Sequence, residues 1–490
     1  MQSPIASGSV RTPSGLTLAV STSRAATLID PSDLTSVATA TETMTVNGRA
    51  YQRTYDSATS GVTERSPAGR DAVRILDAKG HVIEERLPGF IPIAYSYDVL
   101  GQLISKAQGD RTTTYSFNAA GRIESETDAL SRTRRFEYDA VGRITKETLP
   151  DQRELLLSYD ANGNATSITP PARPAHNFSY TPVDLESEYA PPAVVTPSAT
   201  TYSYNLDRQL TRVTRPDGQV IDVGYDTGGR LTSVTQPRGT VSYTYDTAGR
   251  TASATAPASA TATASVSPEV VAFAYDGFLL TSASATGSAP GVVAYSYDND
   301  FRVTSVSVNG AAVNFAYDAD SLLTDAGALT ISRDAQNRST TVGSIATSYT
   351  YDSYGDLASI AAPNFSVTHT RDSLGRITRK SETVNGAAAT LDYAYDSAGR
   401  LASGGGGMYT YDGNGNRLPG VYDDQDRLLS FGTATYTYNA NGDLSSKTNP
   451  TGTTSYTYDA LGNLTSAVLP DATRIDYAID ALNRRIAKRV

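Results

Sequence analysis

The stretch Tyr138-Asp139-Ala140-Val141-Gly142-Arg143-Ile144 decides the fold, because the same phrase returns throughout the chain. It is repeated as Tyr225-Asp226-Thr227-Gly228-Gly229-Arg230-Leu231 and as Tyr395-Asp396-Ser397-Ala398-Gly399-Arg400-Leu401. Between Tyr97 and Tyr245 its aromatic residue recurs at steps of 20 to 24 residues. A fixed period of this kind is typical of a repeat protein, in which each unit is stabilised by its neighbours.

Each repeat is predicted to be one β-hairpin. Residues 113–117 and 133–138 alternate bulky and polar side chains, as a strand with one buried face does. The Asp-x-x-Gly that follows is turn chemistry, since Asp accepts from nearby backbone amides and Gly supplies a positive φ. The opposite end has turns such as 149–152 and 215–218, with Pro in the second position. Two strands of about six residues and two turns of about four account for the period.

The residues of the phrase are assigned a structural role. We expect the Tyr side chains to form a ladder between neighbouring hairpins, and Asp139 and Arg143 to pair across their turn or with the next hairpin. The signature positions are Tyr97, Asp98, Gly101, Tyr138, Asp139, Gly142, Arg143, Tyr159, Asp160, Gly163, Tyr225, Asp226, Gly229, Arg230, Tyr245, Asp246, Gly249, Arg250, Tyr395, Asp396, Gly399, Arg400, Tyr458, Asp459 and Gly462.

The repeats indicate one continuous array and no series of separate domains. Residues 1–70 are expected to be an N-terminal lead-in of degenerate repeats, and residues 71–490 the array itself. Long loops are expected near 186–200, where prolines gather, and near 251–270, where almost every residue is small. The phrase resumes in phase after each loop, so neither loop is read as a domain boundary.

Composition excludes several classes of protein. The net charge of −10 leaves no basic face for phosphate contacts, so nucleic-acid binding is not expected. The absence of Cys excludes disulfides, thiolate metal sites and a catalytic thiol. No segment has the roughly 18 consecutive apolar residues of a membrane-spanning helix, and no secretory signal is visible at the N-terminus.

No catalytic or metal constellation stands out from the repeat. Every Asp is explained by its turn, so a glycosidase-like carboxylate pair is not favoured. Residues 160–164 and 412–416 resemble the first half of a Ca²⁺ loop, but both lack the Gly and the Glu that complete one. His81, His176 and His369 have no ligand spacing. We therefore expect no enzyme activity, no cofactor and no metal.

The repeated phrase resembles the YD repeats of the RHS (rearrangement hotspot) family, which includes toxin-complex C components and the teneurins. The match covers residues 71–490 and rests on many copies in phase. The resemblance implies an all-β fold of tandem β-hairpin repeats, forming a spiralling ribbon that curls into a hollow shell. Family members usually close with an Asp-Pro-x-Gly type motif, and this chain stops before one, so we expect it to lack that closure and to end on an open sheet edge.

The resemblance also implies a function. The chain is expected to be a non-enzymatic shell that encapsulates and helps to deliver a polypeptide cargo, such as a C-terminal toxin, in secretion or contact-dependent competition. Such a protein is secreted or lies at the cell surface. The alternative is a cell-surface adhesion or carbohydrate-binding repeat protein that contacts a glycan or protein. A β-propeller is disfavoured as the fold, since two hairpins per blade would require nearly twelve blades and propellers usually have about 4–8.

Overall fold

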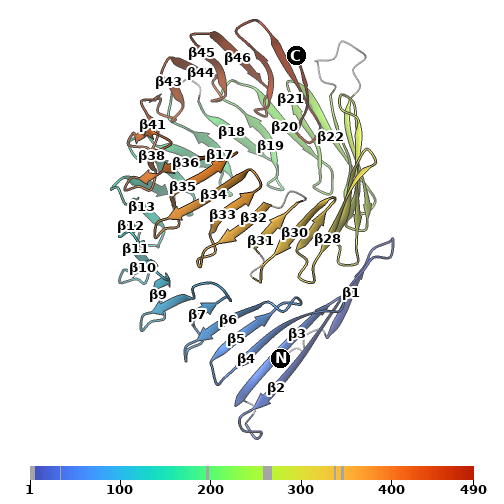
Figure 1. The fold of residues 1–490 in the computed structure, drawn as a ribbon. Helices are drawn as coiled ribbons and strands as arrows, with labels where there is room; N and C mark the ends of the chain where they lie inside the picture. The colour runs from blue at the N-terminus through green and yellow to red at the C-terminus, as the bar shows by residue number, and fades with distance from the viewer. Residues whose placement is uncertain (1–5, 34, 195–197, 258–267, 336–337, 344–346) are drawn as a thin grey trace.

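The computed structural model describes residues 6–33, 35–194, 198–257, 268–335, 338–343 and 347–490. Over these residues all regular secondary structure is β, with no helix. The chain runs as one ribbon of hairpins through almost its whole length (Figure 1). The prediction of an all-β fold of tandem hairpins is therefore confirmed.

The ribbon begins with a sheet of 36 strands. These are β1(Ser7–Arg11), β2(Thr17–Leu28), β3(Val37–Val46), β4(Arg49–Asp56), β5(Gly61–Arg65), β6(Asp71–Leu76), β7(Val82–Arg86), β8(Ile93–Tyr97), β9(Leu103–Gln108), β10(Arg111–Phe117), β11(Ile123–Thr127), β12(Thr133–Tyr138), β13(Ile144–Thr148), β14(Glu154–Tyr159), β15(Ala165–Thr169), β16(His176–Tyr180), β17(Glu186–Ala190), β18(Thr200–Tyr204), β19(Leu210–Thr214), β20(Val220–Tyr225), β21(Leu231–Gln236), β22(Gly239–Tyr245), β23(Thr251–Ala256), β24(Glu269–Asp276), β25(Leu279–Thr286), β26(Gly291–Tyr297), β27(Val303–Val308), β28(Ala311–Tyr317), β29(Leu323–Ala326), β30(Leu329–Arg333), β31(Ser339–Val342), β32(Thr347–Tyr351), β33(Leu357–Ala362), β34(Phe365–Arg371), β35(Ile377–Val384) and β36(Ala387–Asp392).

Three smaller sheets continue it, of three, two and eight strands. These are β37(Ala394–Tyr395), β38(Leu401–Gly404) and β39(Gly407–Met408); β40(Thr410–Tyr411) and β41(Arg417–Leu418); and β42(Val421–Tyr422), β43(Leu428–Phe431), β44(Ala434–Tyr438), β45(Leu444–Asn449), β46(Gly452–Tyr458), β47(Leu464–Val468), β48(Arg474–Ile479) and β49(Arg485–Arg489).

The described strands pair antiparallel with their neighbours in the chain, as β12 does with β11 and β13. One end of each repeat is a turn that follows the phrase Tyr-Asp, here called the YD turn. The other end is called the far turn. At residues 139–143 the YD turn follows a β-bulge, which moves Tyr138 opposite Ile144 after Glu137 has paired with Lys146. Bulges bend and twist a strand, and the same irregularity recurs in hairpin after hairpin, so it favours curvature of the whole ribbon.

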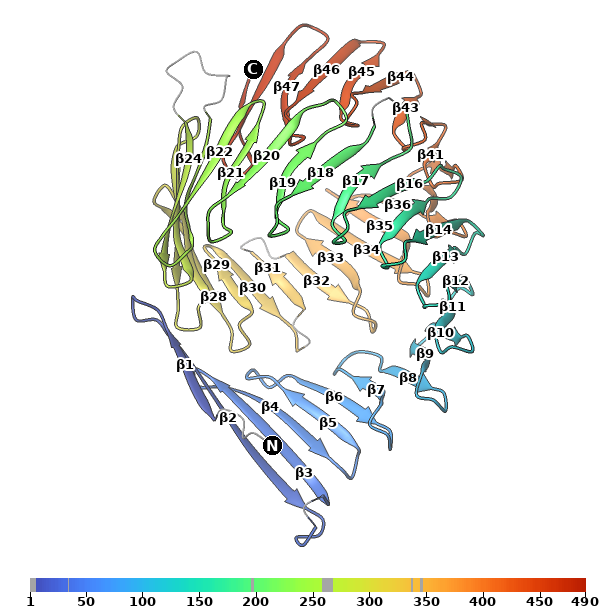
Figure 2. The ribbon, with the colours of Figure 1, turned by 180° about the vertical axis from the view of Figure 1, so that it is seen from behind.

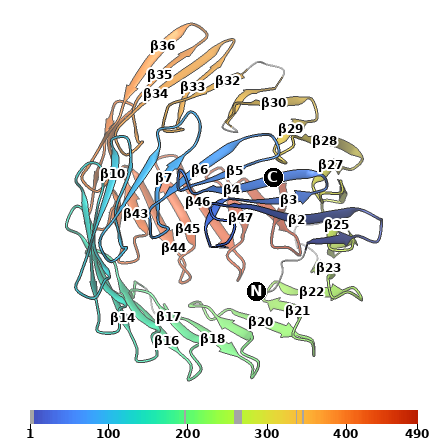
Figure 3. The same cartoon turned by 90° about the horizontal axis from the view of Figure 1, so that it is seen from below.

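The curved ribbon passes round twice. The first winding contains β1 to β23 and the second contains β24 to β49. Figures 1 and 2 show β28 to β33 lying beside the N-terminal strands, and β43 to β47 beside β17 to β22. Seen from below in Figure 3, the strands follow one another round a ring. A small buried cluster of Val241, Ala254, Ala256 and Ala481 lies where the ends of the two windings meet.

The regions expected to be irregular are partly strands. In the N-terminal lead-in, residues 1–70, the described part forms β1 to β5, two of them unusually long at 12 and 10 residues. β17 covers the start of 186–200 and β18 begins at its last residue, which leaves residues 191–199 as the connection. β23 and β24 likewise narrow the second expected loop, near 251–270, to 257–268. Within these connections, residues 195–197 and 258–267 lie outside the described part of the chain.

Many strands that lead into a YD turn have two unlike faces. In β14 the side chains of Leu155, Leu157 and Tyr159 are partly covered, and those of Glu154, Leu156 and Ser158 are exposed. β8, β16, β18 and β44 show the same alternation, with their aromatic side chains on the more covered face. We call this the aromatic face and its opposite the small-residue face. The period-two pattern expected for a half-buried strand is present in the structure.

Candidate functional site: the seam between two windings

The aspartate of the phrase organises its turn by accepting backbone hydrogen bonds. Oδ1 of Asp139 accepts from the backbone N–H groups of Val141, Gly142 and Arg143, at 3.1, 2.8 and 2.9 Å. Its Oδ2 accepts from Nε of Arg143 at 2.6 Å. The backbone N–H of Arg143, together with its side chain, lowers the pKa of Asp139 below the ordinary range. Asp139 and Arg143 therefore pair across the turn as the sequence suggested.

The link between repeats differs from the expected Tyr ladder. The hydroxyl of Tyr138 donates to the carbonyl of Ile123 in the preceding repeat, at 2.7 Å. The guanidinium of Arg143 lies over the ring of Tyr159 in the next repeat, 4.6 Å from its centroid, and donates to the carbonyl of Asp160 at 2.9 Å. Among the described residues no two Tyr rings are stacked. Arginine and tyrosine alternate instead, because a cation over a ring and a hydroxyl bonded to a carbonyl both satisfy polar groups.

Arginine also replaces the tyrosine where the phrase is degenerate. Arg333 donates from Nη2 to the carbonyl of Leu323 at 3.0 Å, and Arg371 donates to that of Leu357 at 3.1 Å. Both reach the carbonyl that a Tyr hydroxyl reaches elsewhere, as Tyr411 does at Leu401. The sequence showed only that the aromatic was lost at these positions, whereas the structure shows that its hydrogen bond is kept.

The two windings meet along a seam of polar contacts, which is the most specific feature of the molecule. Far turns of the first winding touch YD turns of the second. The pairs, with the first-winding residue first, are Ser14 with Asp276, Asn47 and Arg49 with Asp300, Arg70 with Asp318 and Asp320, Arg111 with Asp356, Arg173 with Asp412 and Asp426, Arg215 with Asp443, Asp217 with Asn441, and Arg238 with Asp459. The offset along the chain stays within 221–282 residues, from Arg238 with Asp459 to Thr17 with Asn299, so the second winding follows the course of the first.

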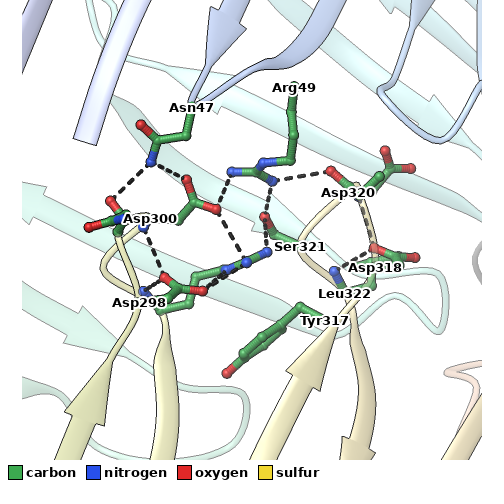
Figure 4. A network of polar contacts seen from close by, with 12 residues as sticks. Asn47, Arg49, Asp298, Asp300, Tyr317, Asp318, Asp320, Ser321 and Leu322 are labelled. Atoms are coloured by element: carbon green, nitrogen blue, oxygen red, sulfur yellow. Dashed lines mark hydrogen bonds and ion pairs between the residues drawn. The ribbon is translucent and has the colours of Figure 1, made fainter. Parts of the chain in front are cut away.

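Figure 4 shows one part of this seam in detail. Asn47 donates to Asp300 at 2.7 Å, and Arg49 forms an ion pair with the same carboxylate at 2.8 Å. Arg49 also donates to Oγ of Ser321 at 2.6 Å, and Arg302 approaches Asp300 at 3.2 Å. The side chains of Arg49 and Asp300 are 18% and 13% exposed, so this pair is largely shielded from water, and the loss of one partner costs more here than at an exposed pair.

Sequence reasoning missed the seam, although a signal for it was present. Arginine occurs at far turns of the first winding at positions 49, 70, 111, 132, 153, 173, 215 and 238, in steps near the repeat length or twice that length. The far turns 309–310, 385–386 and 405–406 of the second winding contain no charged residue, and its last far turn, 469–473, contains Asp471 but no arginine. Arginine therefore recurs with the repeat period only in the far turns of the first winding, and these are the turns that face carboxylates of the second winding.

The signature positions are distributed over separate turns and form no single site. The sets that begin at Tyr97, Tyr138, Tyr159, Tyr225 and Tyr245 belong to YD turns of the first winding, and those at Tyr395 and Tyr458 belong to the second. Only the last two lie on the seam. There Gly399 is approached so closely that an added Cβ would lie 2.7 Å from Nη1 of Arg132, and Asp459 lies 3.4 Å from Nε of Arg238.

Two of the three histidines and the two calcium-like stretches have ordinary polar partners. Nδ1 of His369 is buried and has no hydrogen-bond partner among the described residues. Nδ1 of His81 lies 2.9 Å from Oδ2 of Asp77, and its ring stacks on Tyr97, so it occupies the place of the phrase arginine. Nδ1 of His176 lies 2.7 Å from the hydroxyl of Tyr189. Oδ2 of Asp412 is bonded by Arg173 and Asn416. In the described part of the chain no group of three or more His, Cys, Asp or Glu is arranged to hold a metal ion.

A groove lies beside the seam on the aromatic face of β3 to β6. It has a volume of about 630 Å³ and is lined by Met44, Tyr51 and Phe90 among others. A second cavity of about 270 Å³ shares Phe90 with it. Ala335 and Tyr354 of the second winding complete the two walls. The groove therefore depends on contact between the windings.

Next to this groove the charged side chains neutralise one another across the strands. Arg74 pairs with Glu64 at 2.9 Å and with Glu85 at 3.0 Å. The hydroxyl of Tyr95 donates to Glu85 at 2.9 Å, and burial together with this carboxylate raises the pKa of Tyr95 to about 12. This part of the aromatic face consists of paired charges beside apolar and aromatic groups.

The fold and the seam define a class of repeat protein, in which one ribbon of β-hairpins winds round and packs against its own next winding. The teneurin YD-shell family model matches residues 8–490, and the chain belongs to that family. In the part of the chain that the structure describes, no helix is long and apolar enough to cross a membrane.

Solved structures show the same fold at low sequence identity. A crystal structure of TcdB2-TccC3 is 13% identical, with a TM-score of 0.66 over 99% of this chain and 33% of the other. A crystal structure of TcdB2-TccC3-TEV is also 13% identical, with a TM-score of 0.64 over 94% of this chain and 31% of the other. This chain thus spans about a third of the length of each. No curated protein gives a significant sequence match.

Proposed function

We propose that the chain is the wall of a container that encloses a polypeptide and takes part in its delivery from a secreted or cell-surface protein. The observation that carries this proposal is the seam, which joins turns 221–282 residues apart and holds the two windings of the curved ribbon together as a wall. Membership of the YD-shell family and the fold shared with TcdB2-TccC3 support it. The cargo in this proposal is a toxin-like segment of the parent protein.

The aromatic face is the face that lines the enclosed space in this proposal. A single curved sheet crowds side chains on its concave face and spreads them on its convex face. In β44 the rings of Tyr436 and Tyr438 are partly covered, whereas the smaller Thr435 and Thr437 are exposed. That difference supports assigning the aromatic face to the concave side, where tyrosines and paired charges would offer a polypeptide both apolar contact and hydrogen bonds.

The chain has no catalytic step in this proposal. The YD-turn carboxylates are occupied by backbone amides and by their own arginines, as Asp226 is by Gly228 and Arg230. The pKa of Asp226 is lowered, first by the backbone N–H of Arg230, whereas a general acid requires a raised pKa. The role that remains for these groups is to hold the wall.

Protection of an attached polypeptide tests the container. An unstructured reporter with several protease sites is fused after Val490, and its cleavage rate is compared with that of the free reporter. We expect slow cleavage in the intact chain and faster cleavage when Arg173→Ala and Arg215→Ala open the seam. Arg212→Ala, at an ion pair that is 54% and 46% exposed, is the control and should leave protection unchanged. A reporter cut as fast in the intact chain as in solution would contradict encapsulation.

A further inference from the structure

Asparagine precedes glycine at six turns of the chain, and at five of them the asparagine side chain is held by a hydrogen bond. The six asparagines are Asn47, Asn162, Asn309, Asn385, Asn414 and Asn441. Nδ2 of Asn162 donates to Asp184 at 2.8 Å, and Nδ2 of Asn414 likewise donates to a carboxylate of a neighbouring turn. Oδ1 of Asn309 accepts from the backbone N–H of Val292 at 2.8 Å.

Two of the held asparagines belong to the seam. Nδ2 of Asn47 donates to Asp300 at 2.7 Å and to the carbonyl of Asn299 at 3.0 Å (Figure 4). Nδ2 of Asn441 donates to Asp217 at 2.7 Å, and its Oδ1 accepts from the backbone N–H of the same residue at 3.2 Å. In both cases the partner lies in the other winding, so the closed seam holds these two amides in place.

The side chain of Asn385 has no such restraint. It is exposed, and it makes no hydrogen bond within the described part of the chain. Asn385 and Gly386 have φ of 49° and 83°, and Asn47 and Gly48 have φ of 45° and 84°, so both pairs form tight hairpin turns of the same type. The two turns thus share a backbone conformation and differ in whether the asparagine amide is held.

An asparagine that precedes glycine can react with its own backbone. The backbone nitrogen of the glycine attacks Cγ of the asparagine, a new N–Cγ bond closes a cyclic imide, and Nδ2 leaves as ammonia with the proton that the backbone nitrogen gives up. Water then adds to one imide carbonyl and opens the ring, which leaves aspartate or isoaspartate. Glycine has no side chain to hinder the attack. A held amide must first give up its hydrogen bonds, so its reaction is slower.

We propose that Asn385 is a site of spontaneous deamidation while the seam is closed, and that the seam protects Asn47 and Asn441 from this reaction until the windings separate. Conversion of Asn441 to aspartate places a carboxylate where its amide now donates to Asp217 at 2.7 Å. Two carboxylates at this distance repel each other. A seam that opens and reacts therefore cannot restore this contact, whereas the turn of Asn385 has no seam contact to lose.

Peptide mapping by mass spectrometry, after incubation at mildly alkaline pH, tests the protection. We expect Asn385 to convert roughly tenfold faster than the five held asparagines, since breaking one or two hydrogen bonds costs about that factor in population. Asp217→Ala removes the carboxylate that holds Asn441 and should raise the rate at Asn441 severalfold. Asp222→Ala, at an exposed ion pair away from the seam, is the matched control and should leave every rate unchanged.

Variants that imitate the product test the consequence. Asn441→Asp should accelerate hydrogen exchange in the turn 439–443, and Asn385→Asp should leave exchange there unchanged. Circular dichroism checks that every variant retains its β signal. The proposal is overturned if Asn47 or Asn441 converts as fast as Asn385 in the unmodified chain, or if Asp217→Ala leaves the rate at Asn441 unchanged. Equal exchange in the two product variants would contradict the lasting effect on the seam.

Discussion

The regular first winding and the short repeats of residues 393–427 both connect successive YD turns, but the strands between those turns differ in length. Between residues 77 and 250 the strands are five to seven residues long. In the short stretch β37, β39, β40, β41 and β42 have two residues each, and successive tyrosines are only 16 and 11 residues apart, at Tyr395, Tyr411 and Tyr422. Strand pairing is therefore much reduced there.

The YD turn and its links survive this reduction. Asp396 accepts from the backbone N–H of Arg400 at 2.8 Å, and the guanidinium of Arg400 lies 4.6 Å from the ring centroid of Tyr411. The Tyr411 hydroxyl donates to Leu401 at 2.8 Å. The YD turn is thus the constant unit of the ribbon and strand length is adjustable. The seam compensates for the lost pairing, since Arg173 joins two of the short turns through Asp412 and Asp426.

We expect the largest loss of stability from the removal of Arg173, because its seam contacts hold the short repeats in place. Arg173 is 15% exposed and bonds Asp426 at 2.7 Å and Asp412 at 3.0 Å, so Arg173→Ala leaves two shielded carboxylates without their cation. We expect a loss of about 2–4 kcal/mol in the local free energy of unfolding. Hydrogen exchange should accelerate mainly in residues 409–428. Equal exchange in Arg173→Ala and the control Arg212→Ala would show that the seam does not stabilise the short repeats.

A change in the regular region should have a smaller but clear effect. Gly229 has φ of 78°, and Gly142 and Gly399 have φ of 98° and 86°, as their place in the turn requires. Gly229→Val puts a β-branched residue into this left-handed region and should cost about 1–3 kcal/mol. Asp226→Asn should cost less, because Asn118 already accepts from the backbone of Ala120 and Arg122 in the same way.

Chemical denaturation of both variants provides the comparison. If Asp226→Asn were the more destabilising of the two, the charge and not the turn geometry would be the important property of this aspartate.

The tyrosine hydroxyl allows the two regions to be compared directly. Tyr138→Phe and Tyr411→Phe each remove one hydrogen bond to a carbonyl of the preceding repeat, of 2.7 and 2.8 Å. Each should cost about 0.5–1.5 kcal/mol, with the larger loss at Tyr411, because fewer strand hydrogen bonds remain around it. Local hydrogen exchange measures both. A larger loss at Tyr138 would contradict the idea that short repeats depend more on their links.

Acid should weaken the regular repeats gradually. Backbone N–H groups, of Arg143 and of Arg230, are the largest causes that lower the pKa of Asp139 and of Asp226 in the folded state. A lowered folded-state pKa stabilises the fold above the unfolded value of about 3.9, and this contribution is lost as pH falls through the folded pKa. Stability should therefore be level near neutral pH and fall below about pH 4. Urea unfolding from pH 7 to pH 2.5 tests this, and Asp226→Asn should show a shallower decline.

Local features of the fold were predictable because they depend on neighbouring residues. The phrase 138–144 predicted the hairpin, the Asp139 turn and the positive φ of Gly142, and each is present. The prediction of a tyrosine ladder named the wrong contact between repeats, because the ring of Tyr159 packs against Arg143 and not against another tyrosine. Periodicity shows that two side chains recur together, but it does not show which of them crosses to the next repeat.

By itself the sequence determined the repeat, the two kinds of turn and the glycine positions, since these follow from hydrogen bonds within a few residues. Only the tertiary structure decided that Arg49 meets Asp300 and that Arg173 meets Asp412, across offsets of more than two hundred residues. The physical reason is cumulative curvature. Each bulged hairpin adds a small twist and bend, and the sum over the strands β1 to β23 sets the circumference that brings one turn of the ribbon onto another.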